Sequence, residues 1–186
     1  MDLNQFSLLI IMAVSAVFVF EIFALALYAC SRQVRTQLQN IPYTYYLLAI
    51  GALSLASTVG ALIFQLWYLT PVCELCWWQR VFMFPITIIV GVALYSKDRF
   101  AHITTGILTL IGGFYAAYHY YYHYQGLVLG KTLSLPCSTF GLLPSCTDSA
   151  ILIFGFVTIP LMALLSFGAL LILMYLAHYS LSRTQI

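Results

Sequence analysis

Long apolar runs constrain the fold of this chain more than any other feature of its sequence. A helix of about 18 or more apolar residues can cross a bilayer, and five runs reach that length, at residues 6–29, 45–69, 77–95, 103–124 and 150–178. Only 6% of the residues are charged, whereas soluble domains carry about 25%. Such a chain cannot cover a surface that faces water. We therefore expect an all-α integral membrane protein with five spans.

The lysines and arginines between and after these runs predict the orientation. Five of them fall on one side of the predicted topology: Arg32, Arg35, Lys97, Arg99 and Arg183. Only Lys131 lies in the connections on the other side. Positive residues favour the cytoplasm, so we expect a multi-pass protein of the bacterial plasma membrane with a cytoplasmic C-terminus. The net charge of +2 is too small to indicate a nucleic-acid partner.

The first apolar run is not expected to be cleaved. The flank MDLNQ has no positive charge and the run after it is too long for a cleavable signal peptide. We interpret the run as a retained helix with the N-terminus outside.

Pro85 and Pro160 lie inside the third and fifth runs. Proline is tolerated in membrane helices, so we expect kinks at these positions rather than helix ends.

Four of the five cysteines form two pairs on the predicted outer face. Cys73 and Cys76 precede the third run, and Cys137 and Cys146 lie in the connection before the fifth. Cys30 falls on the cytoplasmic side. The outer face is the side on which disulfides form and persist. The distribution of charge and the pairing of the cysteines thus agree.

The segment CELCWWQR indicates redox chemistry. A disulfide between Cys73 and Cys76 would close a very short ring, which stabilises a fold poorly and exchanges easily. Cys76 should lie at the N-terminus of a helix with Arg80 one turn further on, and both features stabilise a thiolate. The alternative for Arg80 is that it only extends toward the membrane interface.

The remaining residues of interest each have a structural alternative. Trp77 and Trp78 could wall a flat aromatic ligand or simply belong to an interfacial aromatic belt. The disulfide expected between Cys137 and Cys146 could be a structural clip or the second half of a relay between two dithiols. Four cysteines could also bind zinc, but the wide spacing of the second pair and the positive charge of Arg80 disfavour a metal site.

The sequence resembles a known family in two segments. CELCWWQRVFMFP and FGFVTIPLMALLSF are similar to the disulfide bond formation protein B (DsbB) family, in its Gram-positive-like (BdbC-like) branch. The resemblance covers residues 45–179. It implies a four-helix transmembrane bundle over residues 44–186, with the second cysteine pair in an outer loop at 125–149. Residues 1–43, a further N-terminal helix and its cytoplasmic loop, depart from the four-helix pattern.

The resemblance also implies an activity. Members of the family are membrane oxidoreductases that reoxidise a thioredoxin-fold dithiol protein and reduce a membrane quinone, either a ubiquinone or a menaquinone. Carried across by position, Cys137 would accept the attack of the partner and Cys146 would exchange with Cys73. Cys76 would be the thiolate that faces the quinone.

The same resemblance suggests residues around the quinone. Arg80 and Trp77 would lie beside it. The family has a histidine near the outer end of its next-to-last helix, and His119 and His123 are both candidates, one turn apart in YHYYYHYQ. An ungapped match favours His119. The alternative for either residue is an ordinary interfacial histidine.

Two other functions compete with this interpretation. A vitamin K epoxide reductase-like enzyme also couples a quinone to a C-x-x-C pair, but its active pair lies near the last helices of the chain. A non-catalytic membrane scaffold could hold its four cysteines in static disulfides. Quinone consumption would separate the scaffold from both enzymes.

Overall fold

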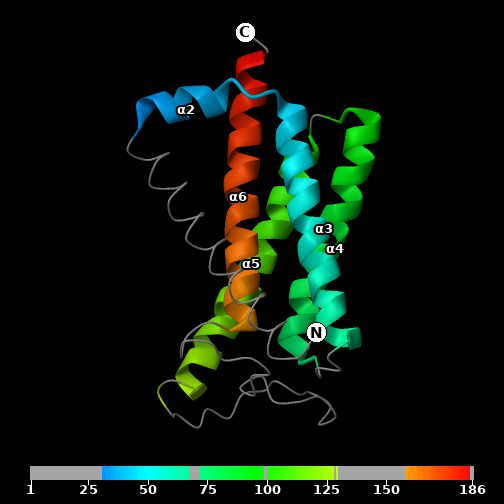
Figure 1. The fold of residues 1–186 in the computed structure, drawn as a ribbon, viewed down its shortest axis with the longest axis vertical. Helices are drawn as coiled ribbons and strands as arrows, with labels where there is room; N and C mark the ends of the chain where they lie inside the picture. The colour runs from blue at the N-terminus through cyan, green and yellow to red at the C-terminus, as the bar shows by residue number, and fades with distance from the viewer. Residues whose placement is uncertain (1–30, 68–71, 99, 128, 130–157, 185–186) are drawn as a thin grey trace, which may run out of the picture. The chain divides into compact units, whose positions relative to one another are not determined.

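Every element that the structure describes is a helix (Figure 1). The computed structural model describes residues 31–67, 72–98, 100–127, 129 and 158–184. The chain divides into two compact units, Met1–Ile41 and Pro42–Ile186. The first predicted span, at residues 6–29, lies outside the described residues, and the predicted boundary between residues 43 and 44 stays a prediction.

Helix α2, Arg32–Gln39, stands where the sequence suggested a loop. Its N-cap is Ser31, whose hydroxyl accepts a hydrogen bond from the backbone N–H of Val34 at 3.4 Å, the usual role of a serine at this position. At the other end the N–H of Asn40 donates to the carbonyl of Gln37 at 3.1 Å. The loop prediction was wrong here because charge and polarity were taken as loop signals, although capped polar segments also form helices.

The described residues of the second unit form four long helices: α3 (Tyr43–Trp67), α4 (Glu74–Ser96), α5 (Ala101–Leu127) and α6 (Ile159–Thr184). The predicted runs at 45–69, 77–95 and 103–124 agree with α3, α4 and α5 to within a few residues. Membrane-spanning stretches by length and composition occur in three of the four helices, at Tyr43–Ile63, Glu74–Ser96 and Ile159–Ser182. Helix α5 is 27 residues long, but its tyrosines, histidines and glycines lower its hydropathy. Its span, and the count of five, stay predictions.

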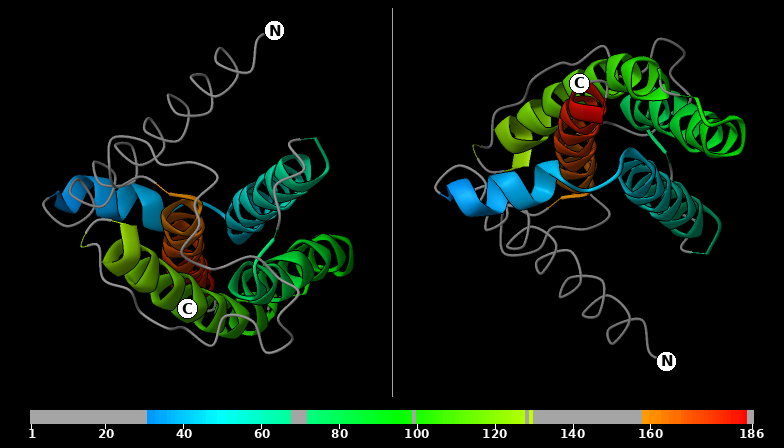
Figure 2. Two further views of the ribbon diagram at one scale, coloured as in Figure 1. Left: turned by 90° about the horizontal axis from the view of Figure 1, so that it is seen from below. Right: turned by 90° about the horizontal axis from the view of Figure 1, so that it is seen from above.

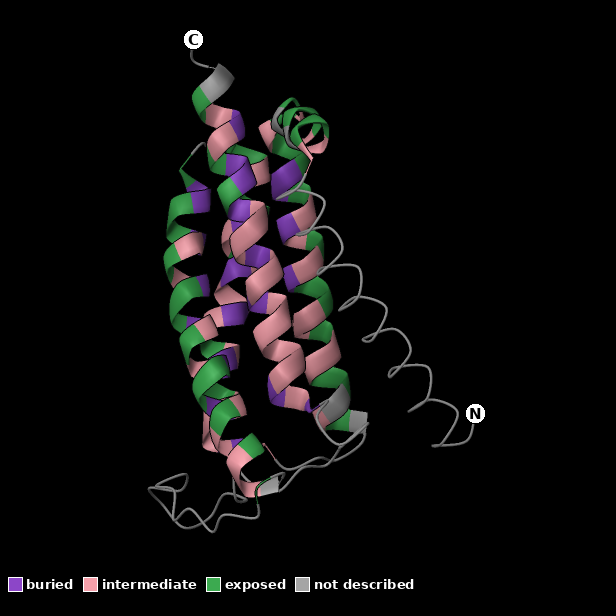
Figure 3. Ribbon diagram, turned by 90° about the vertical axis from the view of Figure 1, so that its left-hand side faces the viewer, coloured by how far each residue is buried: buried purple, intermediate pink, exposed green. Residues whose placement is uncertain are grey.

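Each of these helices packs against two others, in the cyclic order α3, α4, α5, α6, and Figure 2 shows them from their ends. Buried residues face the neighbouring helices, and exposed residues cover much of the outer faces (Figure 3). The centre holds side chains that are at most 1% exposed, from α3, α4 and α6: Ile50, Ile86, Val90, Phe167 and Leu170. An apolar exterior around this centre is what a bilayer requires.

Close approach of α5 to its neighbours depends on a glycine. A Cβ atom at Gly112 would lie 2.5 Å from the ring of Phe167 and 3.0 Å from Cβ of Phe82. Small residues at such contacts let membrane helices pack closely. Gly112 thus allows α5 to contact both α4 and α6 at this level.

The two prolines have different positions. Helix α4 continues through Pro85 without ending. Pro160, by contrast, is the second residue of α6 and lies in its first turn, where no intrahelical partner is lost because the first N–H groups of a helix are unpaired. The kink expected inside the fifth span at Pro160 is therefore corrected, since the helix begins there.

A polar chain joins three helices near the start of α5. The hydroxyl of Tyr43 lies 3.3 Å from Nδ1 of His102, and Nε2 of His102 lies 3.0 Å from Nδ1 of His178. These side chains come from α3, α5 and α6. The chain links helices that otherwise contact one another through apolar side chains.

Candidate active site

The cysteine pair marks the start of α4. Cys73 is the N-cap residue, with an extended backbone, and its carbonyl accepts a hydrogen bond from the N–H of Trp77 at 3.2 Å. Cys76 lies in the first turn. The two sulfur atoms are 3.2 Å apart, with Cys73 as the donor. The sequence predicted this location, and the structure places both sulfurs at one helix end where they can form a bond with little movement.

The two thiols have unequal surroundings. Cys73 is buried, whereas Cys76 is half-buried. Cys73 makes no side-chain cap hydrogen bond to the helix. The N–H groups of the first turn carry the positive end of the helix dipole, which favours negative charge on a sulfur at this end.

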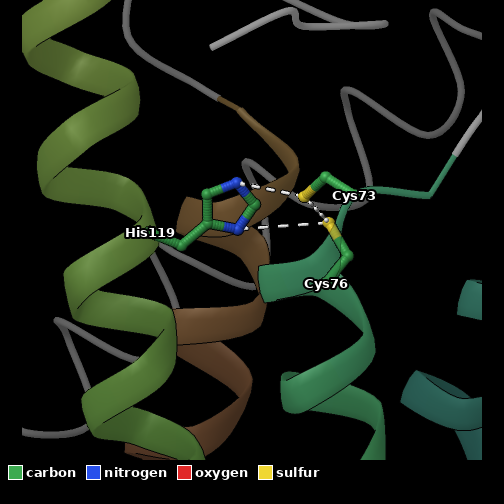
Figure 4. Close-up of side chains that lie close together, drawn as sticks. All are labelled: Cys73, Cys76 and His119. Carbon is green, nitrogen blue, oxygen red and sulfur yellow. Dashed lines mark hydrogen bonds between the residues drawn. The ribbon is translucent and has the colours of Figure 1, made fainter. Parts of the chain in front are cut away.

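His119 of α5 contacts both sulfur atoms. Its Nε2 lies 3.7 Å from Sγ of Cys73 and its Nδ1 lies 4.0 Å from Sγ of Cys76. The imidazole points from α5 directly toward the thiol pair (Figure 4), and the side chain is 2% exposed. The structure therefore places His119 against two cysteines that precede it by at least 43 positions in the sequence.

His123 lies one turn further along α5, beside His119 rather than against the sulfurs. The two imidazole rings are 6.2 Å apart and nearly perpendicular. His123 is buried, and its Nδ1 has no hydrogen-bond partner within the described parts of the chain. Of the two histidine candidates, His119 is thus the one with contacts to both thiols.

Gln79 is a site residue that the sequence did not suggest. Its side-chain Nε2 lies 3.0 Å from Nδ1 of His119, and the side chain is 6% exposed. Gln79 follows Cys76 by three residues, so the two lie on the same face of α4. That spacing from Cys76 is the signal in the sequence that indicates a place for Gln79 in the site.

Arg80 is held by α3. Its guanidinium donates to the side-chain oxygen of Gln65 and, at 3.1 Å, to the carbonyl of Ala61. It also lies 5.5 Å from the centre of the Trp77 ring, within the range of a cation–π contact. Both oxygens are uncharged, so these contacts orient the guanidinium without neutralising it.

An aromatic stack lies next to this face of α4. The ring of Trp78 is 5.5 Å from that of Tyr115 at an angle of 10°, and Phe82 is 5.6 Å from Tyr115 at 17°. Trp77 and Trp78 are both exposed, at 45% and 41%. Trp77 covers the arginine and Trp78 joins α4 to α5. These positions fit both an interfacial belt and a wall for a flat ligand.

The donor atoms of Cys73, Cys76 and His119 all lie within 4.8 Å of one another. Two sulfurs and one imidazole nitrogen are ligands that zinc accepts. The same three groups also suit a thiol pair that cycles through a disulfide, since an imidazole beside a thiol can stabilise its thiolate. The sequence predicted no metal, and this prediction stays open.

The second cysteine pair lies outside the described residues. Cys137 and Cys146 both fall within residues 130–157. Their pairing and their exchange with Cys73 stay predictions. The loop predicted to begin at residue 125 begins later, because α5 extends to Leu127.

Comparison with known proteins gives a consistent set of relatives. The family model described as "Disulfide bond formation protein DsbB" matches residues 43–177. The chain is 33% identical over 131 residues to "Disulfide bond formation protein C" of Bacillus subtilis (strain 168), covering 70% of this chain and 91% of the relative. It is 36% identical over 128 residues to the "Probable disulfide formation protein" of Metapseudomonas resinovorans, covering 69% and 85%.

A third relative extends the range of organisms. The "Probable disulfide formation protein" of Coxiella burnetii (strain RSA 493 / Nine Mile phase I) is 32% identical over 130 residues, which cover 70% of this chain and 85% of the relative. No solved structure matches.

Proposed function

The chain belongs to the disulfide bond formation protein DsbB family, and on this premise we propose that it is a quinone-dependent thiol–disulfide oxidoreductase of the membrane. It would reoxidise a thioredoxin-fold dithiol protein and pass the electrons to a quinone, either a ubiquinone or a menaquinone. One observation carries the proposal: two cysteine sulfurs lie 3.2 Å apart at the head of a helix that is long and apolar enough to cross a membrane, with one imidazole against both.

This geometry suits a disulfide that forms and breaks during turnover better than one that only stabilises the fold. A disulfide between Cys73 and Cys76 would close a short ring at a helix end, which constrains the unfolded chain little. Labile disulfides are those that exchange with thiolates. The helix N-terminus lies at the pair and the imidazole of His119 contacts it through Sγ of Cys73, so both are positioned to stabilise such a thiolate.

The proposed cycle conserves electrons and protons. A thiolate of the partner attacks Cys137, and the partner leaves oxidised while Cys137 and Cys146 become thiols. Cys146 then exchanges with Cys73, which restores the outer disulfide and leaves Cys73 and Cys76 reduced. The Cys76 thiolate passes an electron pair to the quinone as the Cys73–Cys76 bond forms. The two protons released by the thiols complete the quinol.

Arg80, Trp77 and His119 are the residues that we propose beside the quinone, with His123 behind them. Charge develops on a quinone oxygen during reduction, and a fixed cation near that oxygen stabilises it. Arg80 meets this requirement because Gln65 and Ala61 orient it through uncharged oxygens. Trp77 lies against the guanidinium and offers an exposed flat surface.

Quinone absorbance in detergent is the experiment that tests the proposal. The purified protein is mixed with a quinone and a reduced thioredoxin-like dithiol protein, and quinol formation is followed for the wild type and Cys76→Ser. We expect consumption only with the wild type, while Cys137 of the variant still forms a mixed disulfide. Normal turnover by Cys76→Ser would contradict the relay.

Two outcomes favour the other candidate functions. No consumption of either a ubiquinone or a menaquinone would favour a scaffold with static disulfides. Quinone consumption that persists in a Cys137→Ser, Cys146→Ser variant without delay would favour a vitamin K epoxide reductase-like arrangement, in which the C-x-x-C pair acts without this outer pair.

A further inference from the structure

The buried amide of Gln79 has a consequence for the chemistry of the thiol pair. We propose that Gln79 is a positioning residue: it holds His119 in the tautomer with its proton on Nε2, and this directs a chain of hydrogen bonds toward the sulfur of Cys76. The catalytic meaning of this chain rests on the proposed function. The tautomer itself is a property of the protein alone.

The side-chain amide of Gln79 contacts the imidazole of His119. The side-chain nitrogen of Gln79 lies 3.0 Å from Nδ1 of His119. An amide nitrogen donates and does not accept, so Nδ1 must accept. A neutral imidazole has one donor and one acceptor nitrogen, and its proton is therefore on Nε2. Both side chains are buried, so water competes little for either group.

The hydrogen bonds continue from His119 to the two sulfurs. Nε2 faces Sγ of Cys73 at 3.7 Å, and the thiol of Cys73 donates to Sγ of Cys76 at 3.2 Å. Three donors in succession thus point the same way, and the last acceptor is the Cys76 sulfur. A chain of this direction stabilises negative charge at its end, which places the thiolate on Cys76 rather than on Cys73.

The longer contact between the imidazole and Cys76 does not change this direction. Nδ1 of His119 lies 4.0 Å from Sγ of Cys76, further than its 3.0 Å contact with Gln79. With Nδ1 accepting from the amide, it offers no proton to that sulfur. Gln79 thereby makes Nδ1 the acceptor and Nε2 the donor. The two sulfurs alone would not decide which ring nitrogen carries the proton.

The tautomer can be measured directly by ¹⁵N NMR. The full chain is labelled with [¹⁵N]histidine, reduced, and studied in detergent at about pH 8.5, well above the usual imidazole titration. The four histidines are assigned by substituting them one at a time. For His119 we expect a protonated Nε2 and an unprotonated Nδ1. A protonated Nδ1 or an imidazolium would overturn the proposal.

A pair of variants tests whether Gln79 is the cause. Gln79→Met keeps a side chain of similar length but removes the donor, and we expect His119 to become a mixture of both tautomers. Gln65→Met is the matched control, because Gln65 contacts Arg80 and not His119, and it should leave the His119 tautomer unchanged. A Gln79→Met protein that keeps the proton entirely on Nε2 would also overturn the proposal.

Thiol reactivity provides a second readout. Reduced protein is treated with iodoacetamide, and the alkylation rates of Cys73 and Cys76 are compared by peptide mass spectrometry. We expect Gln79→Met to lower the ratio of Cys76 to Cys73 alkylation by about tenfold, the effect of roughly one hydrogen bond to a charged group. An unchanged ratio would contradict the directed chain.

These measurements need neither quinone nor partner, so they fail separately from the proposed function. A protein with the Nε2 tautomer but without quinone consumption would retain this inference and lose the proposed activity. A protein that consumes quinone but carries the Nδ1 tautomer would do the reverse.

Discussion

Cys73 and Cys76 are three residues apart but occupy different surroundings. Cys73 is buried under His119, whereas Cys76 is half-buried. In the proposed relay Cys73 meets a protein sulfur and Cys76 meets a quinone. The more accessible thiol is thus the one assigned to the quinone in the membrane. The imidazole of His119 contacts both sulfurs.

Substitution of His119 is the first prediction at this scale. His119→Ala removes the donor to Cys73 from the hydrogen-bond chain that ends at the Cys76 sulfur, and we expect quinone reduction to slow by about 10- to 100-fold, the range for one hydrogen bond that stabilises a charged group. His123→Ala is the control, because His123 lies beside His119. Single-turnover quinone absorbance measures both. A larger effect of His123→Ala would reverse the assignment of the two histidines.

Arg80 permits a second prediction. Arg80→Ala removes the cation held against Gln65 and Ala61, and we expect the KM for quinone to rise by about tenfold through the loss of one charge-assisted contact. Arg80→Lys should give an intermediate KM, since lysine keeps the charge but not the planar fork. An unchanged KM in Arg80→Ala would show that this residue only orders α3 against α4.

At the scale of the element, α5 depends on its glycine contact. It brings His119 to the thiols while packing against both α4 and α6. The clearance at Gly112 is too small for a Cβ atom, whereas at Gly113 the nearest atom would be 3.6 Å away, an ordinary contact. Two adjacent glycines in one helix therefore have different structural requirements.

This difference predicts unequal stabilities. Gly112→Ala should destabilise the protein by about 1–3 kcal/mol, the usual effect of overpacking, because the Phe167 ring is buried and has little room to move. Gly113→Ala should be neutral or slightly stabilising, because alanine favours helix. Thermal unfolding in detergent compares the two. Equal Tm values for the two variants would mean that α5 and α6 can move apart at the contact of Gly112 with Phe167 without a loss of stability.

At the scale of the whole molecule, the chain is a helical membrane protein of the DsbB family, as the CELCWWQR segment suggested. Its topology is so far predicted from the loop charges alone. The thiol pair opens a helix that is long and apolar enough to cross a membrane, so we expect it at one membrane face. The relay requires this to be the outer face.

Labelling with a membrane-impermeant maleimide tests the topology. In a Cys137→Ser, Cys146→Ser variant the remaining cysteines are Cys30, Cys73 and Cys76. After reduction of intact cells, we expect label on Cys76 and none on Cys30, because the two should lie on opposite sides. Permeabilised cells provide the control, in which Cys30 also becomes reactive. Label on Cys30 in intact cells would invert the predicted orientation.

Much of the fold was predictable because its signals are local. Apolar runs located α3, α4 and α5, and the C-x-x-C pair was correctly placed at the head of α4. The polar segment of α2 and the start of α6 at Ile159 were not predicted. Capping by Ser31 and the first-turn position of Pro160 are features of helix ends, which hydropathy alone does not report.

The sequence by itself determined that the apolar segments of α3, α4 and α5 are helical and that a thiol pair opens α4, because hydrophobicity and cysteine spacing act over short stretches of chain. The family resemblance favoured His119 over His123, but only the tertiary structure decided that His119 meets both sulfurs. The two histidines share one face of α5, about 6 Å apart along its axis, so choosing between them requires the height of α5 relative to α4. Side-chain packing between the two helices, such as the contact of Gly112 with Phe82, sets that height, and it also brings Gln79 against the imidazole of His119.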